Sequence, residues 1–118
     1  MTQTIADSIL VIDDAPKVCA LVAHTLSELP YRVLTADSVR SAKEVVENEI
    51  DRIRVLVVDF GLPDGNGLDV IYEARRLKPG LPILLMSGYA VGSEADVGFI
   101  LKPFDPEDLL DRVEAMAR

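Results

Sequence analysis

Reactive polar side chains follow four of the five short hydrophobic runs in this 118-residue chain. Asp13 and Asp14 come directly after the first run, Asp59 after the third, Ser87 after the fourth and Lys102 after the fifth. In open α/β sheets the strands end at a common edge, and sites form outside those ends. We therefore expect the five side chains to share one site.

The side chains of this expected site suit a hard divalent cation and an anion. Three neighbouring carboxylates raise one another's pKa, and a bound cation relieves their repulsion. Their ligand atoms are all oxygen, which favours Mg²⁺ or Mn²⁺ over zinc. Lys102 and Ser87 add a positive charge and a hydroxyl group that suit an anion. These groups are the parts needed to transfer a phosphoryl group to an aspartate, whose carboxylate attacks in line.

The hydrophobic runs themselves predict five strands. The first, third and fourth are rich in Val, Ile and Leu, which is typical of strands covered on both faces in a parallel sheet. The second run carries Arg32 and Thr35, so we predict that it lies at an edge. The runs are Ile9–Ile12, Tyr31–Thr35, Arg54–Val58, Ile83–Met86 and Phe99–Leu101.

Four segments with helical spacing lie between or after these runs. Their predicted starts are Pro16, Asp37 or Ser38, Asn66 and Asp105. Each start carries a proline or a capping side chain suited to the first turn of a helix. The apolar positions predicted to face inward include Leu21 in the first helix and Leu77 in the third. The alternation of strands and helices is typical of a doubly wound α/β domain.

The segment from Gly88 to Gly98 is too short for an ordinary crossover helix. It separates the fourth and fifth runs, and three of its residues are glycine. A crossover to a parallel strand needs about ten to twelve residues. We predict a mobile, mostly irregular crossover with about one helical turn, near Ser93 to Val97.

Composition excludes several classes of function. The chain has 12 Lys plus Arg against 20 Asp plus Glu, a formal net charge of −8. This charge argues against binding nucleic acid or an anionic membrane surface. A single cysteine excludes an internal disulfide framework, and no apolar run has the length of a membrane span. We expect a cytoplasmic protein with one domain over residues 1–118.

Four stretches of the chain together resemble the response-regulator receiver domain of two-component signalling. They are Ile9–Asp14, Val57–Gly67, Met86–Gly88 and Phe99–Phe104. The resemblance covers essentially the whole chain, and the joint pattern is specific. It implies a five-stranded parallel sheet of flavodoxin-like order 2-1-3-4-5, here with helix 4 shortened or absent.

The resemblance implies a role for each acidic residue. Asp59 would be the phosphoacceptor and would also bind Mg²⁺. Asp14 would be a direct metal ligand, and Asp13 a ligand through water. Gly61 would offer its backbone carbonyl to the metal.

The resemblance also implies roles for residues that bind or sense the phosphoryl group. Ser87 would bind its oxygens, and Lys102 would form an ion pair with them. The Lys102–Pro103 peptide bond would be cis. Phe99 corresponds to the aromatic switch position, where it lacks the hydroxyl of the commoner tyrosine.

These implications predict a phosphorylation-controlled signalling switch. It would accept a phosphoryl group from a histidine kinase or phosphotransfer protein in a Mg²⁺-dependent reaction. It would catalyse only its own phosphorylation and dephosphorylation, and it would signal by contact with a downstream protein that the sequence does not identify.

Two other readings have a basis in the sequence. The short crossover supports an interaction module with the receiver fold whose output phosphorylation does not control. A phosphatase that uses an aspartyl phosphate needs a second aspartate two residues after the nucleophile. Gly61 occupies that position, which argues against a phosphatase.

Overall fold

Five parallel strands form one sheet in the computed structural model, which describes residues 7–89 and 97–118. Their order is β2-β1-β3-β6-β7, which is 2-1-3-4-5 when the strands of this sheet are numbered along the chain. The predicted fold class is therefore confirmed, with the second strand at an edge. The strands are β1 (Ser8–Ile12), β2 (Arg32–Ala36), β3 (Ile53–Asp59), β6 (Ile83–Ser87) and β7 (Val97–Leu101).

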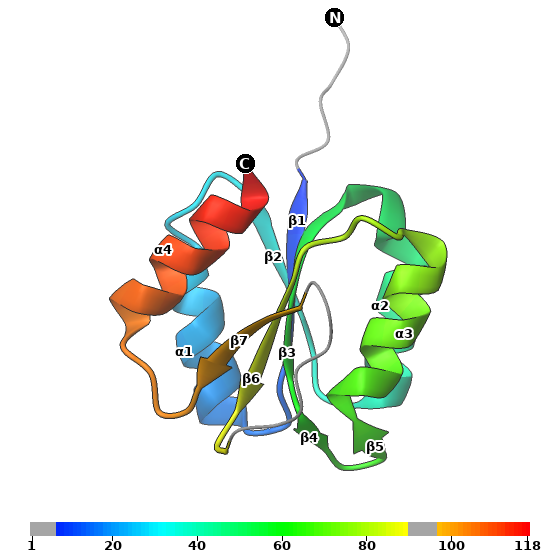
Figure 1. Ribbon diagram of the computed structural model, residues 1–118, viewed down its shortest axis with the longest axis horizontal. Coiled ribbons are helices and arrows are strands. Elements are labelled where there is room, and N and C mark those ends of the chain that lie inside the picture. The colour runs from blue at the N-terminus through cyan, green and yellow to red at the C-terminus, as the bar shows by residue number, and fades with distance from the viewer. Residues whose placement is uncertain (1–6, 90–96) are drawn as a thin grey trace, which may run out of the picture.

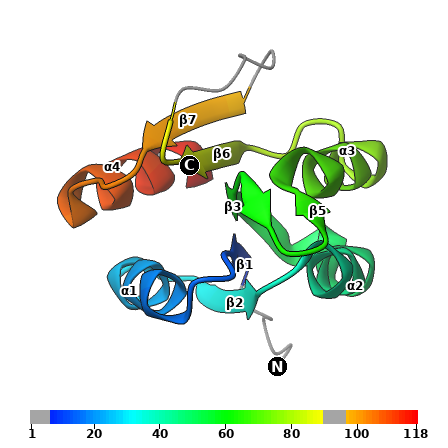
Figure 2. The same cartoon turned by 90° about the horizontal axis from the view of Figure 1, so that it is seen from below.

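Helices cover both faces of the sheet. Figure 2 shows α1 and α4 on one face and α2 and α3 on the other. A short 3₁₀ helix, η1 (Ile50–Arg52), joins α2 to β3. The α-helices of the described residues are α1 (Pro16–Leu26), α2 (Val39–Glu49), α3 (Gly67–Leu77) and α4 (Pro106–Ala117). None of them has the length and apolar character needed to cross a membrane.

Alternating side chains of the central strands fill two separate cores. In β1, Ile9 and Val11 pack on the side of α1 and α4, whereas Leu10 and Ile12 pack on the side of α2 and α3. All four side chains are fully buried. Burial of each such side chain contributes roughly 1.5–3 kcal/mol, and a one-residue slip would exchange the two faces. The register of β1 is thus fixed, and so is the point at which Asp13 leaves the sheet.

Capping side chains start the helices where the sequence predicts. Pro16 occupies the first turn of α1. Ser38, Asn66 and Asp105 each accept a backbone hydrogen bond at the start of α2, α3 and α4, from the N–H groups of Ser41, Leu68 and Glu107. These interactions are local, so the pattern of residue types is sufficient to find them.

The predicted inward positions of Leu21 and Leu77 are wrong. Leu21 is 48% exposed and Leu77 is 37% exposed. In α1 the buried positions are Val22 and Leu26, one turn apart, so the buried stripe is narrower than predicted and Leu21 lies at its margin. Leu77 is the last residue of α3.

A two-stranded antiparallel hairpin follows the central strand and was not predicted. It consists of β4 (Gly61–Leu62) and β5 (Gly65–Asn66). Gly67 closes it: its N–H donates to the Phe60 carbonyl at 2.7 Å. A Cβ atom at Gly67 would lie 2.5 Å from the Asp59 carbonyl oxygen, so glycine is needed for this close approach. Figure 1 shows the hairpin at the same end of the molecule as the N-terminus of α3.

The crossover between β6 and β7 comprises residues 88–96. It is shorter than the sequence predicts, because β7 begins at Val97 and pairs along its length with β6. The prediction of an irregular segment with one turn near Ser93 falls mainly on residues 90–96, which lie outside the described residues.

Candidate functional site

Five of the predicted site residues lie at the carboxyl end of the sheet, which faces the viewer in Figure 2. Asp13 and Asp14 follow β1, and Asp59 is the last residue of β3. Ser87 ends β6, and Lys102 follows β7. Four of these five side chains, all but that of Ser87, are brought into one cluster.

Three carboxylates converge in this cluster. Asp13, Asp14 and Asp59 each have an oxygen atom within 4.8 Å of the others. Asp13 and Asp59 are buried, whereas Asp14 is exposed. Burial raises the pKa of Asp59, and the charges of Asp13 and Asp14 raise it further. The hydrogen bond from Lys102 lowers this pKa only in part, so it stays above its ordinary value. The cluster therefore carries more negative charge than its own cation neutralises.

Lys102 bridges two of the three carboxylates. Its Nζ lies 2.7 Å from Asp13 Oδ2 and 3.1 Å from Asp59 Oδ1. Burial lowers the pKa of Lys102, but the hydrogen bonds to Asp13 and Asp59 outweigh burial and raise it. Lys102 is therefore fully charged at neutral pH. Lys102 thus lies in one site with Asp13 and Asp59, as its place in the sequence predicts, but the individual contacts were not predicted.

The backbone around Lys102 holds its side chain over the end of the sheet. The Lys102 N–H donates to the Ser87 carbonyl at 2.6 Å, which continues the pairing of β7 with β6. The Lys102–Pro103 bond is cis, as the resemblance implied. The chain bends at Lys102 and Pro103, directly after β7, at the edge where the acidic residues lie.

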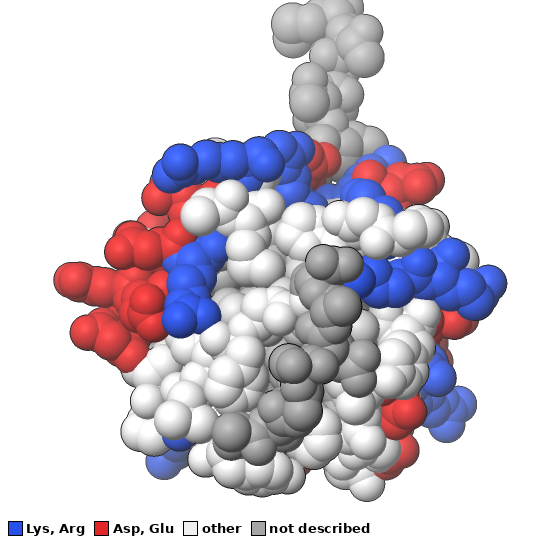
Figure 3. All heavy atoms as spheres, viewed as in Figure 1, with Lys and Arg blue, Asp and Glu red and all other residues white. Residues whose placement is uncertain are grey.

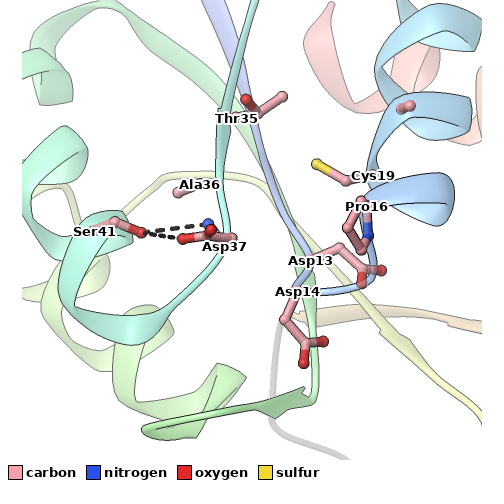
Figure 4. Close-up of a pocket in the computed structure, with 9 residues that line it drawn as sticks. Asp13, Asp14, Pro16, Cys19, Thr35, Ala36, Asp37 and Ser41 are labelled. Carbon is pink, nitrogen blue, oxygen red and sulfur yellow. Dashed lines mark hydrogen bonds between the residues drawn. The ribbon is translucent and has the colours of Figure 1, made fainter.

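Asp13 and Asp14 differ in their freedom to bind a metal. Asp13 Oδ1 accepts a hydrogen bond from the Ala15 N–H at 2.9 Å, and its Oδ2 accepts one from Lys102. Both oxygens of Asp13 are thus already engaged with the protein. Asp14 is solvent-exposed and is one of the residues that line the groove beside α1 (Figure 4). That Asp14 binds a metal directly and Asp13 through water stays a prediction.

Ser87 reaches the rim, but its hydroxyl engages the turn that follows it. Ser87 is 2% exposed. Its Oγ donates to the Tyr89 carbonyl at 2.7 Å and accepts from the Tyr89 N–H at 3.2 Å. To donate to a bound anion, the hydroxyl must rotate away from the Tyr89 carbonyl.

Gly61 lies two residues after Asp59, and Phe99 lies in the middle of β7. Gly61 is exposed at the start of β4, and a Cβ atom there would meet nothing within 4 Å. Phe99 is half-buried on the edge strand β7. Beside Asp59, Phe60 contacts Tyr89 edge-on, with ring centroids 6.1 Å apart. The approach to Asp59 past Gly61 is therefore not blocked by a side chain at that position.

An open groove adjoins the acidic cluster between α1 and the end of β2 (Figure 4). Its volume is about 480 Å³, and Asp13, Asp14 and Cys19 are among its lining residues. Burial raises the pKa of the Cys19 thiol, and the charges of Asp13 and Asp37 raise it further. Both effects disfavour the thiolate, which is the reactive form of cysteine.

Asp64 makes a long-range contact that the sequence did not predict. Its carboxylate accepts hydrogen bonds from the N–H groups of Val39, at 2.7 Å, and Arg40, at 3.0 Å. The motif Leu62-Pro63-Asp64-Gly65 indicates a turn, but nothing in it names a partner 25 residues away. Only the three-dimensional structure places Asp64 at the start of α2.

The donor set of the cluster fits a hard divalent cation. All three side-chain ligands are carboxylates, which are ligands that Mg²⁺ and Mn²⁺ prefer. Burial, and after it the charges of Asp13 and Asp14, raise the pKa of Asp59, and a bound cation would favour its ionised form against both. The adjacent Lys102 supplies a second positive charge, so the same pocket can accept a dianionic group.

Comparison with known sequences gives a consistent result. The profile of the response regulator receiver domain matches residues 9–114. The chain is 31% identical to chemotaxis protein CheY1 of Helicobacter pylori, over 92% of this chain and 94% of CheY1. It is also 31% identical to the probable transcriptional regulatory protein TcrX of Mycobacterium tuberculosis, over 94% of this chain but 50% of TcrX. The chain thus spans nearly all of CheY1 and about half of TcrX.

Solved structures with the same fold cover nearly the whole chain. A CheY-like response regulator receiver domain protein from Methanospirillum hungatei superimposes with a TM-score of 0.86 at 26% identity, covering 96% of this chain and 94% of that one. The receiver domain of the hybrid histidine kinase CckA gives a TM-score of 0.85 at 29% identity, covering 94% of this chain and 99% of that one.

Proposed function

This chain belongs to the response regulator receiver domain family of two-component systems, and we propose that it is a switch controlled by phosphorylation of Asp59. The phosphoryl donor is a phosphohistidine of a histidine kinase or phosphotransfer protein. The output is contact with a downstream protein, whose affinity for this chain changes on phosphorylation.

The observation that carries this proposal is the convergence of Lys102, Asp13, Asp14 and Asp59 at one end of the sheet. Asp59 combines a buried position, a neighbouring cation and a pKa above its ordinary value. Its carboxylate is held at the end of a buried central strand, which limits its motion. These properties suit a nucleophile that must meet a phosphorus atom in line.

The reaction forms one bond and breaks another. A carboxylate oxygen of Asp59 attacks phosphorus, and the P–O bond forms as the P–N bond of the donor breaks. The imidazole of the donor leaves with the electron pair of that bond. Lys102 already forms an ion pair with Asp59 at 3.1 Å, so its positive charge lies beside the group as it arrives.

The cation of this reaction is Mg²⁺. Asp14, Asp59 and the Gly61 carbonyl would hold it, and Asp13 would contribute through water. When bound, it would supply positive charge beside the oxygens of the transferring group.

Two residues act on the product. The Ser87 hydroxyl exchanges the Tyr89 carbonyl for a phosphoryl oxygen, which couples phosphorylation to the turn after β6. Gly61 leaves open space beside Asp59, through which water reaches the acyl phosphate. The chain thus catalyses only its own phosphorylation and the slow hydrolysis of its own acyl phosphate.

Intact-mass spectrometry after incubation with acetyl phosphate and Mg²⁺ tests this proposal. We expect one phosphoryl group on the wild-type chain, none in EDTA, and none on Asp59→Asn. A wild-type chain that stays unmodified, or an Asn variant modified to the same extent, would overturn it.

A further inference from the structure

The start of α2 is capped by side chains from two different parts of the chain. The first four N–H groups of an α-helix have no partner within the helix. In α2 two of them are paired by a capping box: Ser38 Oγ accepts from the Ser41 N–H at 3.0 Å, and Ser41 Oγ accepts from the Ser38 N–H at 3.2 Å. Asp64 satisfies the other two, those of Val39 and Arg40. All four groups are therefore paired.

Asp64 uses both of its carboxylate oxygens for this contact. Oδ1 accepts from Val39, and Oδ2 accepts from Arg40. The hydrogen bond from Val39, and after it the one from Arg40, lower the pKa of Asp64. Both favour the ionised carboxylate. A negative charge at a helix N-terminus is also favoured by the helix dipole.

Asp64 lies between the two strands of the hairpin that leads away from the phosphoacceptor. β4 begins at Gly61, two residues after Asp59. The base of the hairpin is fixed by the Phe60 N–H, which donates to the Met86 carbonyl at 2.8 Å, and by the bond from Gly67 to Phe60. Leu62 is only 8% exposed and packs in the core that α2 and α3 share. Asp64 adds a polar anchor at the tip.

We propose that Asp64 is a positioning residue for the phosphoacceptor site. By holding the tip of the hairpin against the N-terminus of α2, it fixes the backbone from Asp59 to Gly61 in the arrangement that binds a divalent cation. The inference rests on the proposed function, because it gives Asp59 and the Gly61 carbonyl their roles as ligands.

The chain offers a matched control for this inference. Asp64→Ala and Ser38→Ala each remove one capping side chain from the same end of α2. Only Asp64→Ala also releases the hairpin. Asp64→Asn keeps one acceptor oxygen and loses the other, so it should fall between Asp64→Ala and the wild type.

Magnesium titration by calorimetry is the first measurement. Residues that orient metal ligands typically change metal affinity by about 10–100-fold when they are replaced. We expect the Mg²⁺ dissociation constant to rise about tenfold in Asp64→Ala, less in Asp64→Asn, and less than about twofold in Ser38→Ala. Wild-type affinity in Asp64→Ala would overturn the inference. An equal loss in Ser38→Ala would also overturn it, because the effect would then come from α2 alone.

Amide hydrogen exchange in EDTA is the second measurement, and it separates this inference from the proposed function. We expect the amides of Gly61, Leu62 and Gly65 to exchange faster in Asp64→Ala than in Ser38→Ala. A wild-type chain that binds no Mg²⁺ would contradict the metal-dependent function, whereas unchanged exchange in Asp64→Ala would contradict the anchor itself.

Discussion

Lys102 is the residue on which the charge balance of the site depends. It contacts two buried carboxylates, and the shorter contact is with Asp13, whose side chain is fully buried. Removing one partner of a buried charged pair leaves the other without compensation. Lys102 thus has a structural role in the unphosphorylated chain besides its proposed role toward the phosphoryl group.

Lys102→Ala should therefore lower the free energy of unfolding by about 1–3 kcal/mol in EDTA, measured in urea. Mg²⁺ should recover part of the loss, because it neutralises the same carboxylates. Lys102→Arg should not restore the phosphorylation-linked conformational change fully, since a planar fork does not replace a compact point charge. Exposed Lys17 gives the matched control Lys17→Ala, expected within about 0.5 kcal/mol of wild type. An Arg variant equal to wild type would contradict the geometric argument.

Asp59 gives a pH dependence whose sign follows from its environment. Burial and the charges of Asp13 and Asp14 raise its pKa above the ordinary value of 3.8, and Lys102 only partly opposes them. A carboxyl group whose pKa is raised in the folded state makes folding less favourable once it is ionised. The free-energy cost of ionising Asp59 is absent below its ordinary pKa. The cost develops as the pH rises from the ordinary pKa to the folded-state pKa, and it is complete above the latter.

In EDTA, Asp59→Asn should therefore be more stable than the wild type at neutral pH. The difference in stability should vanish below about pH 3, where Asp59 is protonated in both the folded and the unfolded chain. Urea unfolding at a series of pH values measures it. An Asn variant that is less stable than wild type at pH 7 would show that the Lys102 contact outweighs burial and repulsion.

The residue types of the site were predictable because each follows a hydrophobic run. Asp13, Asp14, Asp59 and Lys102 were placed at one edge from that pattern alone, and the structure brings them together. The contact between Lys102 and Asp13 was not predictable, because run order does not say which of two neighbouring carboxylates a lysine reaches. Asp64 was missed for a similar reason, since its partners lie on another element.

Among the structural elements, the hairpin after β3 requires glycine at position 67 but not at position 61. A Cβ atom at Gly67 would lie 2.5 Å from the Asp59 carbonyl oxygen, which is backbone and cannot move aside cheaply. A Cβ atom at Gly61, at the start of the same hairpin, would meet nothing within 4 Å. The two positions provide a paired test of the close approach between α3 and the end of β3.

Gly67→Ala should cost about 1–3 kcal/mol of unfolding free energy, because the added methyl group overpacks the contact. Gly61→Ala should stay within about 0.5 kcal/mol of wild type. Urea denaturation of both variants makes the comparison. Equal losses of stability in the two variants, or a larger loss in Gly61→Ala, would contradict a close contact at Gly67.

The main elements were predictable and the hairpin was not, for physical reasons. Strands buried on both faces and helices with capping side chains leave patterns of five residues or more in the sequence. β4 and β5 have two residues each, too few for any period. The early start of β7 was missed because Val97 and Gly98 do not form an apolar run with Phe99.

At the scale of the whole molecule, charge is unevenly distributed. Figure 3 shows acidic side chains gathered over α4 at one flank and basic side chains along the edge opposite the site. The net charge is −8, and three of the acidic groups meet in one cluster. A divalent cation that binds there acts on the stability of the whole fold, because only the folded chain assembles the cluster.

Mg²⁺ at ten times its dissociation constant should raise the free energy of unfolding by about 1.4 kcal/mol. The thermal midpoint should rise by a few degrees, roughly 3–6 °C for a domain of this size. NaCl at equal ionic strength controls for screening of the net charge, and Asp14→Asn should remove most of the shift. An equal shift in NaCl, or one that Asp14→Asn leaves unchanged, would exclude a specific metal site.

The most direct test of the whole account locates the phosphoryl group on the chain. After reaction with acetyl phosphate and Mg²⁺, borohydride reduces an aspartyl phosphate to homoserine, which peptide mass spectrometry assigns to a position. The account predicts homoserine at position 59 alone, and none when Mg²⁺ is replaced by EDTA. Homoserine at any other aspartate, or phosphate retained on a residue that borohydride does not reduce, would contradict it.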